Sequence, residues 1–407
     1  MIDLTAHIAP GDGVWWGQAG AEPEPLVNAL VDQVPRIGSV RAFVGLTWND
    51  RLSKQLPEQL TVLSYGGLGN LRELSGIGRL EVVPCHYSAL PRLFARGMLP
   101  SDVGLVQVSA PDADGTVSLG IGVEYVADAI PYTKKLIAEI NHAMPSTTGT
   151  ARLPLSRFAA TIEGDRPLRE PPARVPDSVD RAIATHVAGL VRDGDTLQMG
   201  VGSLPNVVLE MLAGHADLGI HTGMISDGVI DLMDRGVVTG ARKEIDPGVA
   251  VTGAALGTRA MYDRLGEFPI EFRPASYTHA PAVLSRLSSL VSINSAIEVD
   301  LYGQVGSETR RGVHVGAIGG QVDFSRAASL TGARSIVMLR SESNGQSSIT
   351  AELHGGVVTT GRADVDVVVT EHGAAVLTGC GITERARRLI DIAAPAHREE
   401  LAENMRS

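Results

Sequence analysis

Short runs of valine, isoleucine and leucine alternate with segments of helical period along most of this chain. The runs are continuously apolar instead of alternating with polar residues, which is typical of strands that are covered on both faces. They are VRAFVGL (40–46), LTVLSY (60–65), VGLVQVS (103–109), KLIAEI (135–140), DTLQMG (195–200), RSIVML (334–339) and VDVVVT (365–370). Strands of this kind separated by helices predict an α/β fold with mainly parallel sheets.

The chain is too long for one ordinary hydrophobic core. Its 407 residues, at roughly 100–200 residues per domain, favour two domains. The stretch EGDRPLREPPARVPDSVD (163–180) holds four prolines and many charges, which is typical of a linker. We therefore predict an N-terminal α/β domain over 1–170, a proline-rich linker over 171–180 and a C-terminal α/β domain over 181–407.

Two pairs of short segments suggest that the two halves are related. GDGVWWG (11–17) and GDTLQMG (194–200) share a pattern, and each leads through small residues to a proline and a helical segment. PDADGTV (111–117) and VDLYGQV (299–305) share the pattern Asp-x-x-Gly-x-Val. A duplicated α/β unit explains both pairs, and a chance match of such short patterns is the alternative.

Charge and cysteine content exclude several classes of partner. The formal net charge of −11 and the lack of a lysine or arginine run argue against nucleic acid, so a small-molecule partner is favoured. Cys85 and Cys380 have neither disulfide-framework nor zinc-ligand spacing, so we expect two buried cysteines and no metal. The N-terminus lacks a signal-peptide pattern and no stretch approaches the ~18 apolar residues of a membrane span. These features predict a cytoplasmic protein with no membrane partner.

Two glycine-rich turns are candidate ligand-binding elements. DTLQMGVGSLPNVVLEML indicates a strand, a Gly200-x-Gly202 turn and a helix with Ser203 as N-cap, whose first amides suit an anion. A tight strand-to-helix connection without a ligand explains this turn equally well. In VGAIGGQVDFSRAASL (315–330), Gly319 and Gly320 precede a helical segment, and such amides suit an oxyanion hole. A flexible glycine-rich loop is the alternative there.

Three further side chains stand at positions where chemistry is plausible. Glu298 lies in a mostly apolar, strand-like run, so its carboxylate is either functional or held by a hydrogen-bond network. Glu371 and His372 end a predicted strand, where open α/β sheets present side chains to ligands. For His372 alone, a structural role is the favoured interpretation.

Taken together, these segments resemble the acetyl-CoA hydrolase/transferase family, which includes 4-hydroxybutyrate and acetate CoA-transferases. The resemblance covers nearly the whole chain through GAEPEPLVNAL, VSAPDADGTVSLG, LQMGVGSLPNVVL, GIHTGMISDGVIDL, INSAIEVDLYGQVGSE, GGQVDFSRAAS, GVVTTGRADVDVVVTEHG and LTGCGITERARRLIDIAAP. It implies two similar open α/β domains of the CoA-transferase fold and coenzyme A or acyl-CoA as substrate, bound mainly by the C-terminal half. It also implies a homo-oligomer, in the simplest case a homodimer.

The resemblance further implies nucleophilic catalysis by a glutamate. In the family, this carboxylate attacks the acyl-CoA carbonyl, an enzyme glutamyl-CoA thioester forms, and an incoming carboxylate reverses the sequence. The loop matching GGQVDF supplies amide donors to the thioester oxygen, so the resemblance assigns Gly319, Gly320, Gln321 and Val322 to the CoA site. The Gly200-x-Gly202 turn is assigned to the same site.

The expected nucleophile is missing from this chain. The family motif reads His-Thr-Glu or Tyr-Thr-Glu before Asp-Gly, whereas here it reads His221-Thr222-Gly223, with Asp227-Gly228 intact behind it. Glu298 lies too close to the glycine loop in sequence to be the motif glutamate, which leaves it an auxiliary acid. Asp227 is a helical turn or a loop away, and a displacement of ~1 Å can cost ~100-fold in rate.

The departure at Gly223 leaves several functional hypotheses. The first is an acyl-CoA enzyme that hydrolyses its thioester directly or transfers the acyl group to a non-carboxylate acceptor. Its candidate bases are His221, Asp227, Glu298, Glu371 and His372. The alternatives are an ordinary carboxylate CoA-transferase whose catalytic glutamate was replaced by Gly223, a non-catalytic CoA-binding protein, and a sugar-phosphate isomerase of similar fold. Trp15 and Trp16 either line the acyl side of the site or belong to the core.

Overall fold

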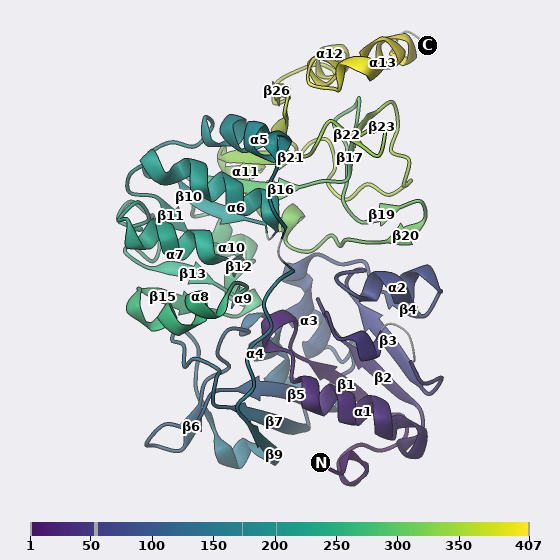
Figure 1. The fold of residues 1–407 in the computed structure, drawn as a ribbon, viewed down its shortest axis with the longest axis vertical. Coiled ribbons are helices and arrows are strands. Elements are labelled where there is room, and N and C mark those ends of the chain that lie inside the picture. Colours follow the sequence, from purple (N-terminus) through teal and green to yellow (C-terminus); the bar gives the residue numbers. More distant parts are fainter. Residues whose placement is uncertain (1, 53–55, 173, 201, 406–407) are drawn as a thin grey trace. The chain divides into compact units, whose positions relative to one another are not determined.

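The structure is a computed structural model that describes residues 2–52, 56–172, 174–200 and 202–405. The chain forms two compact units, each discontinuous in sequence. The first comprises Met1–Pro171, Val251–Thr278 and Val313–Gly319, and the second comprises Pro172–Ala250, His279–Gly312 and Gly320–Ser407. Both are α/β, as predicted (Figure 1). The division into three continuous segments stays a prediction, because two stretches from beyond the linker pack with the first unit.

The first unit is built on a seven-stranded parallel sheet in the order β4-β3-β2-β1-β5-β7-β9. Its strands are β1 (Gly13–Trp16), β2 (Val40–Phe43), β3 (Leu60–Ser64), β4 (Leu80–Val82), β5 (Val103–Val108), β7 (Lys135–Asn141) and β9 (Phe158–Gly164). Among the residues that the structure describes, the α-helices between these strands are α1 (Glu24–Ile37), α2 (Leu71–Gly76), α3 (Leu90–Ala95) and α4 (Glu124–Ala129). Smaller elements are β6 (Thr116–Val117), β8 (Leu153–Pro154), β14 (Ala254–Ala255), α8 (Arg259–Arg264), β15 (Ile270–Phe272), α9 (Ala275–Thr278) and β20 (Val313–His314).

Helix α1 illustrates how the sequence positions an element on this sheet. Leu26, Leu30 and Val34 recur at helical spacing and are fully buried, so one face of the helix packs on the core. The helix ends at Gly38, whose φ of +107° lies in a region that favours glycine. The polar face remains outward.

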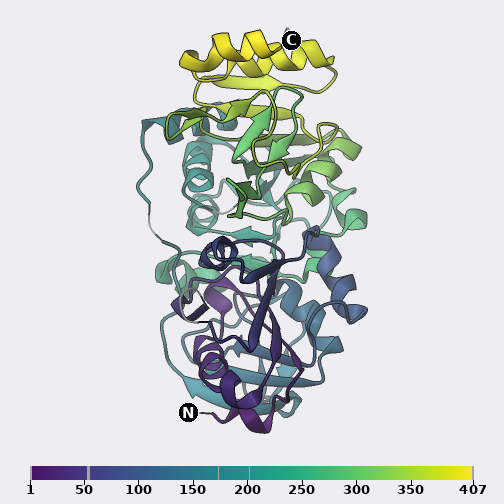
Figure 2. The ribbon, with the colours of Figure 1, turned by 90° about the vertical axis from the view of Figure 1, so that its right-hand side faces the viewer.

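The second unit contains a six-stranded sheet in the order β11-β10-β16-β21-β25-β26, parallel except for β26. Its strands are β10 (Thr196–Met199), β11 (Gly219–Ile220), β16 (Leu290–Ser295), β21 (Arg334–Met338), β25 (Val367–Thr370) and β26 (Gly373–Val376). Helices α5 (Ser178–Ala188) and α6 (Ser203–Met211) cover one face and α11 (Gln321–Thr331) covers the other (Figure 2).

The remaining elements of the second unit are short or lie at its C-terminal end, where α12 and α13 follow β26 (Figure 1). They are β12 (Met224–Ile225), α7 (Asp227–Asp234), α10 (Pro281–Leu284), β17 (Glu298–Asp300), β18 (Val305–Gly306), β19 (Thr309–Arg310), β22 (Glu342–Ser343), β23 (Gln346–Ser347), β24 (Ile349–Thr350), α12 (Ile382–Asp391) and α13 (Arg398–Asn404). Strand β13 (Ala250–Thr252) spans the sequence boundary between the units.

The structure confirms the strands predicted from all seven apolar runs. It also shows that both segments of the second repeated pair, 111–117 and 299–305, form the same turn. Asp112 Oδ1 accepts the amides of Asp114 and Thr116 at 3.1 and 2.8 Å, and Asp300 Oδ1 accepts those of Tyr302 and Gln304 at 3.0 and 2.8 Å. In each turn the glycine that follows has positive φ, +69° at 115 and +85° at 303. Identical local bonding supports the interpretation that the two halves are related.

Trp15 and Trp16 are fully buried, and Trp15 Nε1 donates to Thr133 Oγ1 at 2.9 Å, so of the two alternatives left open, both indoles belong to the core. One local expectation was wrong. Cys85 and Cys380 are half-buried instead of fully buried. Helix α5 begins inside the predicted linker, because Asp177 caps it by accepting the amides of residues 179 and 180.

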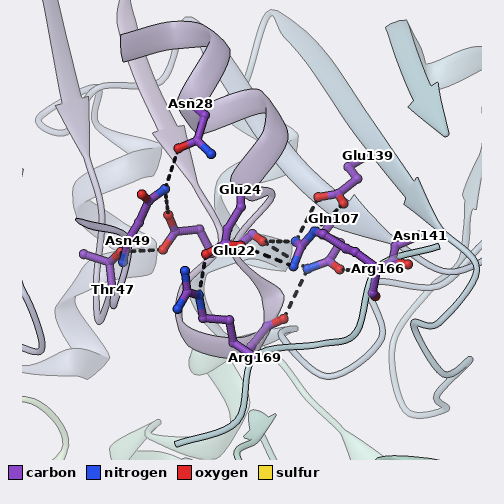
Figure 3. Close-up of polar contacts among 11 residues, drawn as sticks. Glu22, Glu24, Asn28, Thr47, Asn49, Gln107, Glu139, Asn141, Arg166 and Arg169 are labelled. Carbon is purple, nitrogen blue, oxygen red and sulfur yellow. Dashed lines mark hydrogen bonds and ion pairs between the residues drawn. The ribbon is translucent and has the colours of Figure 1, made fainter. Parts of the chain in front are cut away.

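A buried carboxyl group marks the end of the loop between β1 and α1 (Figure 3). Glu22 accepts hydrogen bonds from Thr47 Oγ1 at 2.5 Å and Asn49 Nδ2 at 3.1 Å, and Asn49 Nδ2 also donates to Asn28. Burial raises the pKa of Glu22 to about 7, although these bonds oppose the shift. Burial also raises the pKa of Glu124 to about 7.

We expect Glu22→Gln to flatten the pH dependence of stability. Between pH 4.5 and about 7 the unfolded Glu22 loses its proton while the folded one keeps it, so stability falls as pH rises through this window. The substitution should reduce the slope of the unfolding free energy against pH by the contribution of about one proton. It should also stabilise the first unit by about 1–3 kcal/mol above neutral pH. Urea unfolding followed across this window tests the prediction, with the exposed Glu58→Gln as control. An unchanged slope would contradict it.

Candidate functional site

The carboxyl ends of the parallel strands in the second unit lie along one edge of its sheet, where open α/β sheets bind ligands. The residues at these ends are Gly200 after β10, His221 after β11, Ser295 in β16, Arg340 beyond β21 and Glu371 after β25. Three of them, Gly200, His221 and Glu371, are residues that the sequence predicted. This edge is therefore the candidate site.

The segment His221-Thr222-Gly223 directly follows the edge strand β11. His221 and Thr222 are buried, and the His221 amide donates to the carbonyl oxygen of Leu197 at 3.0 Å. Thr222 Oγ1 donates to the carbonyl oxygen of Met199 at 3.2 Å. These bonds extend the pairing with β10 beyond the end of β11 and hold the half-buried Gly223 beside it.

Asp227 is the first residue of α7, four positions after Gly223. Its N-cap, Ser226, donates a hydrogen bond from Oγ to Asn206 Oδ1 at 2.5 Å, which ties the start of α7 to α6. A carboxylate in the first turn of a helix is favourable because it faces the positive end of the helix dipole. This contribution to the helix start explains Asp227, and its role as a base stays a prediction.

His279 is a residue of this site that the sequence analysis missed. An ideal Cβ on Gly223 would lie 2.8 Å from His279 Cε1 and 3.0 Å from Nε2. An ideal Cβ on Gly320 would lie 2.5 Å from Nε2 and 2.7 Å from Cδ2. The imidazole therefore occupies space that a side chain at either glycine would need. The structure thus brings together Gly223 and Gly320, which the sequence predicted, around a histidine that it did not.

The surroundings of His279 keep its ring neutral and fixed. The residue is only 4% exposed, and its ring packs edge-on against Phe324 with centroids 5.0 Å apart and an interplanar angle of 64°. Burial lowers the pKa of His279 to about 3, and the charge of His221 acts in the same direction. The ring is therefore neutral at physiological pH, and a neutral imidazole carries one nitrogen that accepts a proton.

The glycine loop ends at the start of α11. Gly319 has a φ of +52°, and its carbonyl oxygen accepts the amide of Tyr87 at 2.9 Å within the first unit. Gly320 belongs to the second unit and is the N-cap of α11. Gln321 is buried and donates from Nε2 to Thr360 Oγ1 at 3.1 Å, and Val322 is half-buried. First-turn amides of a helix lack intrahelical acceptors, so the predicted oxyanion role fits this geometry.

The two candidate glutamates are held by loops of their own. Glu298, in β17, is buried and accepts the amides of His354 at 3.0 Å and Gly355 at 2.9 Å. Glu371 accepts the amide and the hydroxyl of Ser341 at 2.9 and 2.6 Å. Both carboxylates thus organise backbone turns, which is the hydrogen-bond-network interpretation of Glu298. Exposed His372 lies next to Glu371, with its Nε2 3.9 Å from Oε1. Their roles as bases stay predictions.

A cavity of about 530 Å³ opens beside the Gly200-x-Gly202 turn in the second unit. Gly202 and Ser203 line it together with Arg310 and Arg340. An adjoining cavity of about 330 Å³ shares Arg310 and reaches Glu298. The N-cap of α6 is Gly202, with a φ of +131°, and not Ser203 as the sequence predicted, because the extended turn places Ser203 in the first helical position. The helix start and two guanidinium groups can hold an anionic ligand here.

The described residues contain no group of three or more histidine, cysteine, aspartate or glutamate side chains arranged to hold a metal ion. No helix in that part of the chain combines the length and apolar character needed to cross a membrane.

The parallel sheet with glycine turns at its carboxyl edge places the chain in the class of open α/β proteins, which bind ligands at that edge. Comparison with known proteins narrows this class to one family. Models of the acetyl-CoA hydrolase/transferase N-terminal and C-terminal domains match residues 2–163 and 257–405. The chain is 38% identical to a 4-hydroxybutyrate coenzyme A transferase of Clostridium kluyveri over 95% of this chain and 92% of that protein.

Two further comparisons agree with this assignment. An acetyl-CoA hydrolase of Eremothecium gossypii is 26% identical over 92% of this chain and 82% of its own length. The crystal structure of RipA from Yersinia pestis superimposes with a TM-score of 0.93 and 35% identity, covering 99% of this chain and 95% of that one. The chain belongs to the acetyl-CoA hydrolase/transferase family. It is an acyl-CoA transferase-like or hydrolase-like enzyme with the CoA-transferase fold, as the resemblance implied.

Proposed function

We propose that this enzyme cleaves a CoA thioester without a carboxylate nucleophile at position 223, by direct hydrolysis or by acyl transfer to a non-carboxylate acceptor. The observation that carries the proposal is the His279 ring, which lies within 2.8 Å of the place where a Cβ at Gly223 would stand. A side chain at position 223 would therefore require this ring to move. The absent carboxylate and the position of the ring both weigh against the covalent route.

The position of the substrate is part of the proposal. The cavity beside Gly202 combines the N-terminus of α6 with Arg310 and Arg340, and this charge pattern suits the phosphates of CoA. The amides at Gly320 and the start of α11 suit the thioester oxygen. Candidate bases are His221, Asp227, Glu298, Glu371 and His372, and no metal enters the route.

We expect Arg310→Ala to weaken acyl-CoA binding more than it slows the chemistry. A charge-assisted hydrogen bond to a phosphate contributes about 1.5–3 kcal/mol, so KM should rise about tenfold or more while kcat changes little. Steady-state kinetics with acetyl-CoA tests this. Arg387→Ala, which removes an exposed guanidinium on α12, is the matched control. Equal KM values for the two variants would remove Arg310 from the proposed CoA site.

The ordinary transferase with a replaced glutamate is the second hypothesis. The intact Ser226-Asp227-Gly228 segment and glycine loop support it. The position of His279 weighs against it, because restoring a side chain at 223 requires the ring to move. A non-catalytic CoA-binding protein is the third hypothesis. Under all three hypotheses, we also predict a homo-oligomer and a cytoplasmic location.

A mass-spectrometric time course separates these hypotheses. The protein is incubated with a panel of acyl-CoAs of increasing chain length, with and without acetate and with amine or alcohol acceptors. The proposal expects loss of at least one acyl-CoA and release of CoA with no enzyme glutamyl-CoA adduct. Acetate exchange with such an adduct would support ordinary transfer. Binding of CoA without turnover under every condition would support the non-catalytic hypothesis.

A further inference from the structure

The His279 ring lies between two glycines that are far apart in sequence. Its Nε2 atom is 3.0 Å from the ideal Cβ position at Gly223 and 2.5 Å from that at Gly320. Real Cβ contacts under 3.0 Å essentially do not occur, so no larger residue at Gly320 is compatible with this ring position. The two glycines together make room for one imidazole and bring its Nε2 edge to the half-buried backbone at both positions.

The chain around His279 fixes the direction of the ring. His279 stands in the connection between α9 and α10, directly before Ala280, the N-cap of α10, and Pro281 in its first turn. The ring of Phe324, from α11, packs against one side of the imidazole. A ring held by a capped turn and by an aromatic neighbour is preorganised, which a catalytic group requires.

We propose that His279 is the general base that activates water for attack on the acyl-CoA thioester, so that the reaction of this enzyme is hydrolysis. This inference rests on the proposed function, narrows its acceptor to water and assigns the base to a residue outside the five candidates that the sequence named. It places an imidazole beside the residue position at which the family resemblance expects a glutamate. The change from a carboxylate to an imidazole replaces a group that forms a covalent intermediate with one that takes a proton from water.

Water, the thioester and the His279 ring together supply every atom, proton and electron pair that the proposed reaction uses. A neutral His279 nitrogen accepts a proton from water as the water oxygen bonds to the thioester carbonyl carbon. The carbonyl π electrons move to its oxygen, where amides at the start of α11 stabilise the negative charge. Collapse of this intermediate breaks the C–S bond, and the CoA sulfur leaves with the electron pair and takes the proton from the imidazolium. The products are a carboxylic acid and free CoA.

The protonation state of His279 agrees with this role. Burial lowers the pKa of His279 to about 3, and the nearby His221 adds to the shift. The base form is therefore present throughout the physiological range. The same shift makes the ring a weaker base than an exposed histidine, because general bases work best with a pKa near the operating pH, and it favours return of the proton to the leaving sulfur.

The first test compares the parent chain with His279→Gln and with the control His186→Gln, an exposed histidine on α5. Acetyl-CoA and butyryl-CoA are the probes, in water labelled with heavy oxygen. The parent and the control should give free CoA and labelled acid at similar rates. General bases typically contribute 10²–10⁴-fold, so His279→Gln should lower kcat by about 100-fold or more with little change in KM.

A second variant separates a catalytic role from a structural one. His279→Ala leaves a space at the ring position, and added imidazole should restore part of the lost rate in proportion to its concentration. A structural role does not predict such rescue. If neither variant folds, deuterium oxide should slow the parent enzyme, because a proton is in flight in the rate-limiting step.

The failures of the two proposals are distinguishable. If the parent consumes no acyl-CoA with water or any acceptor, the proposed function fails. If the parent hydrolyses acyl-CoA but folded His279→Gln retains its kcat, or the parent shows no slowing in deuterium oxide, His279 is not the base while the proposed function stands. An acylated His279 found by peptide mass would also overturn the inference, since it would make the ring a nucleophile.

Discussion

Gly223→Glu alone is expected to destabilise the second unit and to leave acyl exchange with acetate undetectable. The new Cβ would lie 2.8 Å from the His279 ring, which Phe324 and the α9–α10 connection hold in place. Forcing a side chain into a filled site typically costs about 1–3 kcal/mol. A carboxylate displaced by even ~1 Å from the productive position loses about 100-fold in rate, so adding the missing group does not restore its function.

Removing the obstruction in the same molecule should reverse this outcome. In Gly223→Glu/His279→Ala the carboxylate has room, and we expect acyl exchange with acetate to exceed that of the single variant by about 100-fold or more. Hydrolysis should fall in the same variant, because the proposed base is gone. Mass spectrometry of the intact protein incubated with acetyl-CoA should show a glutamyl-CoA adduct.

The matched control is Gly223→Gln/His279→Ala, which has nearly the same shape and no carboxylate nucleophile. It should form no adduct and exchange no acyl groups. If the single Gly223→Glu variant exchanges as fast as the double variant, the ring does not obstruct position 223. That result would support the hypothesis of an ordinary transferase with a replaced glutamate.

The sequence allowed the fold to be predicted wherever a local pattern decided the structure. Continuous apolar runs such as VDVVVT can be buried only between two covering layers, so β25 and its neighbours were predicted correctly. The repeated pattern Asp-x-x-Gly-x-Val was recognised in the sequence, and the structure shows that at Asp300 it is a turn in which the aspartate binds amides two and four residues ahead. These are short-range rules that a single sequence displays.

Sequence reasoning failed where residues from different parts of the chain decide the structure. His279 lies in no motif, and its partners Gly223 and Gly320 come from two other segments, so only the folded chain reveals the contact. Residues 251–278 pack with the first unit and follow the predicted linker, and no local pattern in the sequence indicates this contact, while the division into three segments stays a prediction. At Ser203 the positive φ of Gly202 moved the cap by one residue, which composition alone does not predict.

Arg166→Ala is expected to lower the free energy of unfolding of the first unit by about 3–5 kcal/mol. Arg166 binds Glu139 through two parallel bonds, Nε to Oε1 at 2.6 Å and Nη2 to Oε2 at 3.0 Å (Figure 3). It also donates to the carbonyl oxygen of Glu22 at 2.6 Å. The Glu139 side chain in β7 is only 1% exposed, so removing its partner leaves a buried carboxylate without a counter-charge.

Tryptophan fluorescence during urea unfolding measures this effect selectively, because Trp15, Trp16 and Trp48 all belong to the first unit. Arg41→Ala is the matched control, since its ion pair with Glu81 is 60% exposed on both sides and should contribute less than about 1 kcal/mol. Glu139→Leu/Arg166→Met should recover most of the loss, because an apolar pair of similar volume needs no charge compensation. Equal losses for Arg166→Ala and Arg41→Ala would mean that water reaches Glu139 in the folded unit. The buried pair would then contribute no more to stability than a surface pair.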